Sequence, residues 1–133
     1  MAGRLLIVDD AMLMRMKIRQ IAEDAGWDVA GEAGDGEQAV AMYADLAPDM
    51  VTMDMVMPRM GGLEALSAIR AADPAARVVM VSAVNQKERL RACIDAGALD
   101  FIVKPFDPAR LTAFFAKYDG ADHDGAGPDG PAA

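Results

Sequence analysis

Four short apolar runs of this sequence each stop at a residue that can take part in acid–base, metal-binding or phosphate chemistry. These residues are the pair Asp9 and Asp10, then Asp54, Ser82 and Lys104. In an open parallel α/β sheet, ligands bind outside the edge that the carboxyl ends of the strands share. If the runs are strands of one such sheet, three carboxylates, a hydroxyl and an ammonium group meet in one crevice.

This set of groups suits phosphoryl transfer assisted by a cation. Three carboxylates at close range repel one another, so one of them is protonated or a cation sits among them. Mg²⁺ fits, because one or two carboxylates hold it together with water and phosphate oxygens. Lys104 can pair with a carboxylate or a phosphoryl oxygen, and Ser82 can donate a hydrogen bond. One carboxylate can then attack phosphorus while the other groups position and neutralise the transferred group.

Five apolar runs alternate with five stretches of helical period. The expected strands are Leu5–Val8, Asp28–Ala33, Met50–Met53, Val78–Val81 and Leu99–Val103. The expected helices are Met12–Ala25, Glu37–Leu46, Leu63–Ala72, Lys87–Ala96 and Pro108–Tyr118. This alternation predicts a doubly wound α/β fold, in which a parallel sheet is covered on both faces. The second strand ends without a polar group, so we expect it at the outside of the sheet.

Local signals support the boundaries and the domain division. Asp107 before Pro108 is typical of a helix start, and Gly26 and Gly97 stand where helices commonly end. Along the first helix we expect Leu13, Met16, Ile18, Ile21 and Ala25 near one buried face. Residues 1–118 are predicted to form one domain. The tail 119–133 contains four aspartates and no Lys or Arg, and is predicted to be a disordered acidic tail or a linker.

Composition excludes several functions. The net charge of −8 argues against non-specific binding to DNA or to anionic membranes, which needs clustered Lys and Arg. The N-terminal apolar run is too short for a signal peptide or a membrane span. Cys93 is the only cysteine, so an internal disulfide is impossible and a reducing compartment is indicated. We therefore expect a cytoplasmic monomer that binds no DNA and does not insert into a membrane.

The strings LLIVDD, VTMDMVMPRMGGLEAL, VVMVSA and DFIVKPF, in this order, resemble the receiver domain of two-component response regulators. The likeness covers about residues 4–118 and is greatest to single-domain chemotaxis regulators. It implies a flavodoxin-like sheet of strand order 2-1-3-4-5. It also implies a phosphorelay in which a histidine kinase phosphorylates the domain. The face made by the fourth helix, fifth strand and fifth helix then binds an output partner, such as a flagellar motor switch protein or a phosphatase.

The resemblance also implies a role for each matched residue. Asp54 is the phosphate acceptor, Asp10 binds Mg²⁺ directly, Asp9 binds it mainly through water, and the Val56 carbonyl completes the protein's ligands. Lys104 contacts the phosphoryl group. The family pattern adds two further expectations: a cis bond before Pro105, and a switch pair formed by Ser82 and Phe101. The protein is then a switch that assists its own phosphorylation and dephosphorylation, rather than an enzyme acting on other molecules.

The two positions that flank the path of attacking water in this family are Val56 and Val84 here. Neither side chain can hydrogen-bond to a water molecule, so we expect slow loss of phosphate from Asp54.

Simpler interpretations exist for the same residues. An Asp after a strand is commonly a loop residue or a helix cap, Ser82 can start a helix, and Phe101 can be a core residue. The eleven methionines, among them Met16, Met50 and Met53, favour core packing over a soft-metal site. Cys93 is expected to be inert, and His123 to be solvated.

Three alternatives to an autonomous switch stay open. The chain can be the receiver module of a longer protein, or a phosphate sink or scaffold without output. It can also be a phosphatase of the haloacid-dehalogenase type. That type needs a second acidic residue two positions after the first aspartate, and Val56 stands there.

Overall fold

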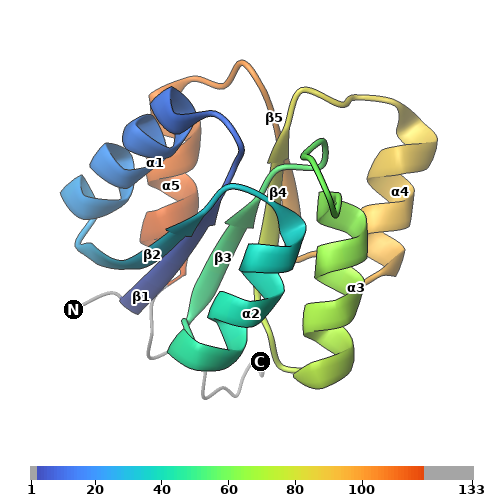
Figure 1. The fold of residues 1–133 in the computed structure, drawn as a ribbon. Helices are drawn as coiled ribbons and strands as arrows, with labels where there is room; N and C mark the ends of the chain where they lie inside the picture. Colours follow the sequence, from blue (N-terminus) through green and yellow to red (C-terminus); the bar gives the residue numbers. More distant parts are fainter. Residues whose placement is uncertain (1–2, 119–133) are drawn as a thin grey trace.

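The computed structural model describes residues 3–118 and contains one five-stranded parallel sheet with helices on both faces (Figure 1). The strands are β1 (Gly3–Val8), β2 (Trp27–Ala33), β3 (Met50–Met53), β4 (Val78–Ser82) and β5 (Asp100–Val103). The helices are α1 (Met12–Asp24), α2 (Gly36–Leu46), α3 (Gly62–Ala72), α4 (Lys87–Asp95) and α5 (Pro108–Lys117). The strand order in the sheet is β2-β1-β3-β4-β5, which confirms the predicted fold class and strand order.

The sheet lies between two helical layers, and each layer encloses its own core. Helices α1 and α5 cover one face, and α2, α3 and α4 cover the other (Figure 1). The central strands β3 and β4 are fully buried along their length, which explains why they are apolar runs without alternation. Within residues 3–118 no helix combines the length and the apolar character that crossing a membrane requires.

The predicted boundary signals act as expected. Asp107 caps α5 by accepting a hydrogen bond from the Ala109 N–H at 2.9 Å. Gly26 and Gly97, which follow α1 and α4, have φ of 90° and 102°, a conformation that favours glycine. The acidic segment 119–133, with His123, lies outside the described residues, so its predicted disorder stays a prediction.

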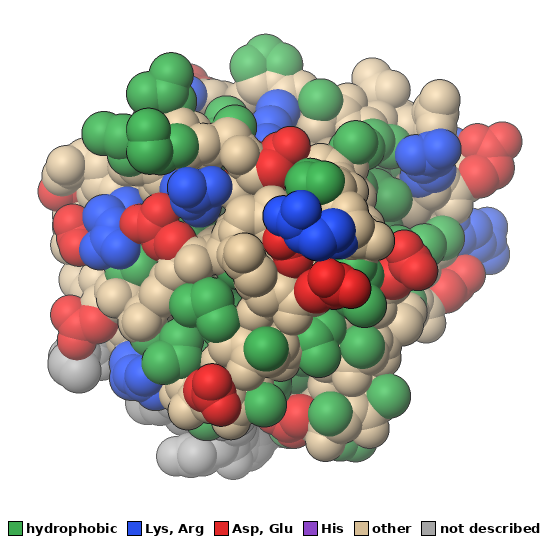
Figure 2. All heavy atoms as spheres, in the orientation of Figure 1, with side chains coloured by type: hydrophobic (Ala, Val, Ile, Leu, Met, Phe, Trp, Pro, Cys, Tyr) green, Lys and Arg blue, Asp and Glu red, His purple; other side chains and the backbone are tan. Residues whose placement is uncertain are grey.

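The predicted buried face of α1 is wrong at Leu13 and Met16. These side chains are 77% and 56% exposed, whereas Ile18 and Ala22 are fully buried. At about 100° per residue, Leu13 and Met16 lie roughly 140–160° around the helix from Ile18, so they cannot share its face. With Met12 they form an exposed apolar patch at the start of α1, and Figure 2 shows hydrophobic side chains gathered over this part of the molecule. Met50 and Met53 are buried core residues, as expected.

Candidate phosphoacceptor site

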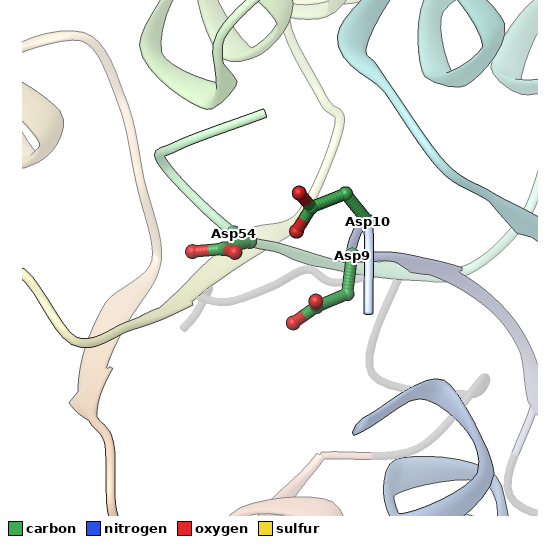
Figure 3. Close-up of side chains that lie close together, drawn as sticks. All are labelled: Asp9, Asp10 and Asp54. Atoms are coloured by element: carbon green, nitrogen blue, oxygen red, sulfur yellow. The ribbon is translucent and has the colours of Figure 1, made fainter. Parts of the chain in front are cut away.

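Three carboxylates lie together at the carboxyl ends of the two neighbouring strands β1 and β3. Val8 and Met53 are partners in the sheet, so Asp9 and Asp54 follow a matched pair of residues. The backbone continues this pairing, because the Asp54 N–H donates to the Val8 carbonyl at 3.0 Å. One carboxylate oxygen from each of Asp9, Asp10 and Asp54 lies within 4.8 Å of the others. Figure 3 shows the three side chains close together, with their carboxylate oxygens pointing to the same side.

The Lys104 ammonium group reaches this cluster from the end of β5. Its Nζ lies 2.6 Å from Asp9 Oδ2 and 3.5 Å from Asp54 Oδ2. The Lys104 N–H donates to the Ser82 carbonyl at 2.8 Å, which ties the end of β5 to the end of β4. The Lys104–Pro105 peptide bond is cis, in agreement with the expectation from the family pattern. One positive charge therefore faces three carboxylates, and the cluster keeps an excess of negative charge.

The two adjacent aspartates differ in how free their oxygens are. Asp9 is 1% exposed, and its carboxylate accepts hydrogen bonds from the Ala11 N–H at 2.9 Å and from Lys104. Asp10 is exposed, and its oxygens face the cluster and solvent (Figure 3). Asp54 accepts one bond from the Met55 N–H at 2.8 Å and keeps its other oxygen toward Lys104. This set of hard oxygen donors fits a divalent cation held by Asp10 and Asp54, with Asp9 further back.

Of the other predicted site residues, Ser82, Val56 and Val84 lie at or after the carboxyl ends of β3 and β4, whereas Phe101 lies within β5. Ser82 ends β4 and is buried, and its Oγ accepts a hydrogen bond from the Val84 N–H at 3.5 Å. Phe101 is half-buried against the core on the α2–α4 side of the sheet. Val56 is exposed in the loop after β3, and Val84 is half-buried in the loop after β4. Thus both loops that flank Asp54 carry an apolar side chain at the predicted position.

The region around β2 contains charged residues that sequence reasoning missed. No β2 side chain within the described residues joins the acidic cluster, but β2 supplies Glu32, which pairs with Arg15 and Arg19 of α1. Burial raises the pKa of Glu32, while hydrogen bonds from Arg19 and Arg15 lower it by more, so the pKa falls below its ordinary value. Thus β2 is an outer strand of the sheet, as expected, and its Glu32 belongs to an ion-pair network with α1 and not to the acidic cluster.

A second missed contact fixes the loop that follows Asp54. Arg59 has φ of 66° and donates through Nε to Asp35 Oδ2 at 2.8 Å. Asp35 is buried and caps α2 by accepting a hydrogen bond from the Gln38 N–H. That hydrogen bond and the pairing with Arg59 hold the pKa of Asp35 below its ordinary value. Neither Asp35 nor Arg59 is a predicted site residue. No local signal relates two residues 24 positions apart.

Comparison with known proteins agrees with this geometry. Residues 5–116 match the family model described as response regulator receiver domain. The chain is 50% identical to the chemotaxis protein CheY of Thermotoga maritima over 111 residues, which are 84% of this chain and 92% of that protein. It is also 50% identical to CheY of Bacillus subtilis with the same coverage.

Among solved structures, the complex of CheX, CheY, BeF3 and Mg²⁺ from Borrelia burgdorferi matches with a TM-score of 0.81 and 38% identity. The match covers 83% of this chain and 84% of that one. This chain thus spans most of each of these relatives, at an identity well above the level at which only the fold is shared. The chain belongs to the family of response regulator receiver domains of two-component systems.

Proposed function

We propose that this receiver domain is a phosphorylation-dependent switch whose phosphate acceptor is Asp54. The observation that carries the proposal is the Lys104 ammonium group between Asp9 and Asp54 at the ends of two central strands. A carboxylate oxygen of Asp54 attacks the phosphorus of a phosphohistidine on the kinase. The new bond is O–P, the bond that breaks is N–P, and the leaving imidazole nitrogen takes a proton from water.

The residues around Asp54 divide the remaining work. Mg²⁺, when bound by Asp10 and Asp54, supplies neutralisation of charge on the transferred group. Lys104, whose Nζ lies 2.6 Å from Asp9 Oδ2, pairs with a phosphoryl oxygen once Asp54 is modified. Ser82 offers a hydroxyl donor from the neighbouring strand end. Asp9 holds Lys104 in place and is too enclosed to be the acceptor.

The output surface that we propose is the face of α4, β5 and α5. Ile94 on α4 and Val103 at the end of β5 are large hydrophobic residues that are 50% and 39% exposed. Phe101 on β5 and Ser82 at the end of β4 connect this face to the acceptor site. A partner that prefers the phosphorylated arrangement shifts the population toward it, as linkage requires.

The relatives named as chemotaxis proteins support a role in motility. We propose a cytoplasmic reaction with a chemotaxis histidine kinase as donor. The output partner is a flagellar motor switch component or a phosphatase, and the domain acts as a monomer. A module of a longer protein or a phosphate sink has the same acceptor chemistry and differs only in its output.

Incubation with acetyl phosphate and Mg²⁺, followed by intact-mass measurement, tests the proposed function. The wild-type protein is expected to gain the mass of one phosphoryl group, and Asp54→Asn is expected to gain none. Chelation of the metal before the incubation is expected to prevent the gain. A phosphoryl adduct of equal yield on Asp54→Asn contradicts the proposal.

Loss of the phosphoryl group is expected to be slow because no polar side chain at position 56 or 84 orients water. The double variant Val56→Asn, Val84→Glu is expected to shorten the half-life of the phosphorylated form by roughly 100-fold, the lower end of general acid–base contributions. Decay is measured by mass after removal of acetyl phosphate. The control Met16→Asn changes a similarly exposed apolar residue on α1, 56% exposed against 62% for Val56, and should leave the rate unchanged. Equal decay of the double variant and the parent rules out this cause of slow hydrolysis.

A further inference from the structure

Arg15 connects strand β2 to the loop that carries the acidic pair. It lies on α1, and its side chain is 19% exposed. Its Nε donates to Glu32 Oε1 at 3.0 Å, and its Nη1 donates to the backbone carbonyl oxygen of Asp9 at 2.7 Å. One guanidinium group thus joins a carboxylate on the outer strand to the peptide group between Asp9 and Asp10.

The orientation of Asp10 depends on that peptide group. Within residues 3–118 the Asp10 carboxylate has no hydrogen bond or ion pair, so its own side chain does not hold it toward Asp54. The backbone before it is fixed on both sides of Asp9, because the Asp9 N–H donates to the Ala33 carbonyl at 3.0 Å and the Asp9 carbonyl accepts from Arg15. A peptide group is planar, so a hydrogen bond that fixes the Asp9 carbonyl also fixes the orientation of the Asp10 N–Cα bond.

Glu32 determines where the Arg15 guanidinium lies. Its carboxylate receives Arg15 through one oxygen and Arg19 Nη2 at 2.7 Å through the other. The planar guanidinium of arginine can donate hydrogen bonds to a carboxylate and a carbonyl at the same time, and the ammonium group of lysine does this less well. Arg19 shares Glu32, but its other partner is Glu23 on the solvent side of α1 and not the acidic loop. Arg19 is therefore a matched control for the loss of one Glu32 contact.

We propose that Arg15, held by Glu32, is a positioning residue for divalent-cation binding at the Asp9–Asp10–Asp54 cluster. The inference rests on the proposed function, since it takes that cluster as the cation site. Partners that orient metal ligands typically contribute about 10–100-fold in affinity. Charge alone predicts the opposite sign, because removing a nearby positive charge strengthens binding of a cation to carboxylates. The direction of the change therefore separates positioning from electrostatics.

Calorimetric titration of Mg²⁺ into the unphosphorylated protein tests the inference without any phosphoryl transfer. Arg15→Met is expected to raise the dissociation constant for Mg²⁺ by about 10–100-fold. Arg15→Lys keeps the charge and one donor, and is expected to give a smaller rise. Arg19→Met is expected to leave the constant unchanged. Thermal unfolding in the presence of chelator checks that each variant is folded. If Arg15→Met is unfolded, the comparison of Arg15→Lys with the wild type serves as the test.

The outcomes separate this inference from the proposed function. If the wild type binds Mg²⁺ and Arg15→Met and Arg15→Lys bind it equally or more tightly, the positioning role is overturned and the proposed function is untouched. A loss in Arg19→Met as large as in Arg15→Met also overturns it, because Arg19 makes no bond to the Asp9 carbonyl and the effect then does not depend on that bond. A wild-type protein that binds no Mg²⁺ overturns the metal-dependent proposal and this inference with it.

Discussion

Lys104→Met is expected to slow phosphorylation of Asp54 by about 10²–10³-fold, the effect of losing one aligned donor to a developing negative charge. The Lys104 ammonium lies 3.5 Å from the Asp54 oxygen, and the variant keeps a side chain of similar length without the charge. The rate is measured as the gain of the phosphoryl mass over time with acetyl phosphate at saturating Mg²⁺. Lys87→Met at the exposed start of α4 is the matched control, with no change expected.

The same variant has a second, independent readout in stability. Asp9 is almost fully buried and loses its 2.6 Å partner, so without metal the free energy of unfolding is expected to fall by about 3 kcal/mol. Mg²⁺ is expected to recover part of this loss, because a cation again faces the carboxylates. Lys104→Met that is phosphorylated at the wild-type rate contradicts the role given to this residue, whatever its stability.

Gly62→Ala is expected to damage both the fold and the acceptor site. A Cβ at Gly62 would lie 2.0 Å from the carbonyl oxygen of Asp54 and 2.8 Å from its carbonyl carbon. Both atoms are backbone, so relief requires the Asp54 peptide to move away from the start of α3. The Gly62 N–H also donates to the Met55 carbonyl at 2.9 Å, and this bond is strained by such a shift. We expect a loss of roughly 1–3 kcal/mol in the free energy of unfolding, together with slower phosphorylation.

Gly61→Ala is the matched control for this prediction. A Cβ at Gly61 would have the Met55 carbonyl oxygen as its nearest neighbour, at 3.2 Å. The φ of Gly61 is −75°, which any residue can adopt. Urea unfolding and the rate of phosphoryl gain are measured for both variants. If Gly62→Ala is as stable and as reactive as Gly61→Ala, the close approach of α3 to Asp54 is not what holds the site.

The sequence predicted those parts of the site that sheet geometry determines. Asp9 and Lys104 are 95 residues apart, yet each comes directly after an apolar run, and the shared edge of a parallel sheet brings them to 2.6 Å. The strand order rested on family resemblance, because periodicity alone does not say which strand lies at the outside. Phosphorylation, the metal and the partners are proposals that the fold supports through its family.

Contacts between elements were beyond sequence reasoning. The Arg59–Asp35 pair and the bond from Arg15 to the Asp9 carbonyl depend on how α1, α2 and the loops pack, and charged residues at these positions look like an ordinary solvated surface. The apolar character of Leu13 and Met16 favours a buried face. Their angular position around α1 puts them in solvent instead.

The most direct test of the central claim locates the modified residue itself. Protein phosphorylated with acetyl phosphate and Mg²⁺ is reduced with borohydride, which converts an aspartyl phosphate to homoserine, and its peptides are sequenced by mass spectrometry. Homoserine is expected at position 54 and at neither Asp9 nor Asp10. Homoserine at Asp9 or Asp10 with an unmodified Asp54, or a phosphoryl group stable to borohydride on another residue, contradicts the assignment of Asp54 as the phosphate acceptor.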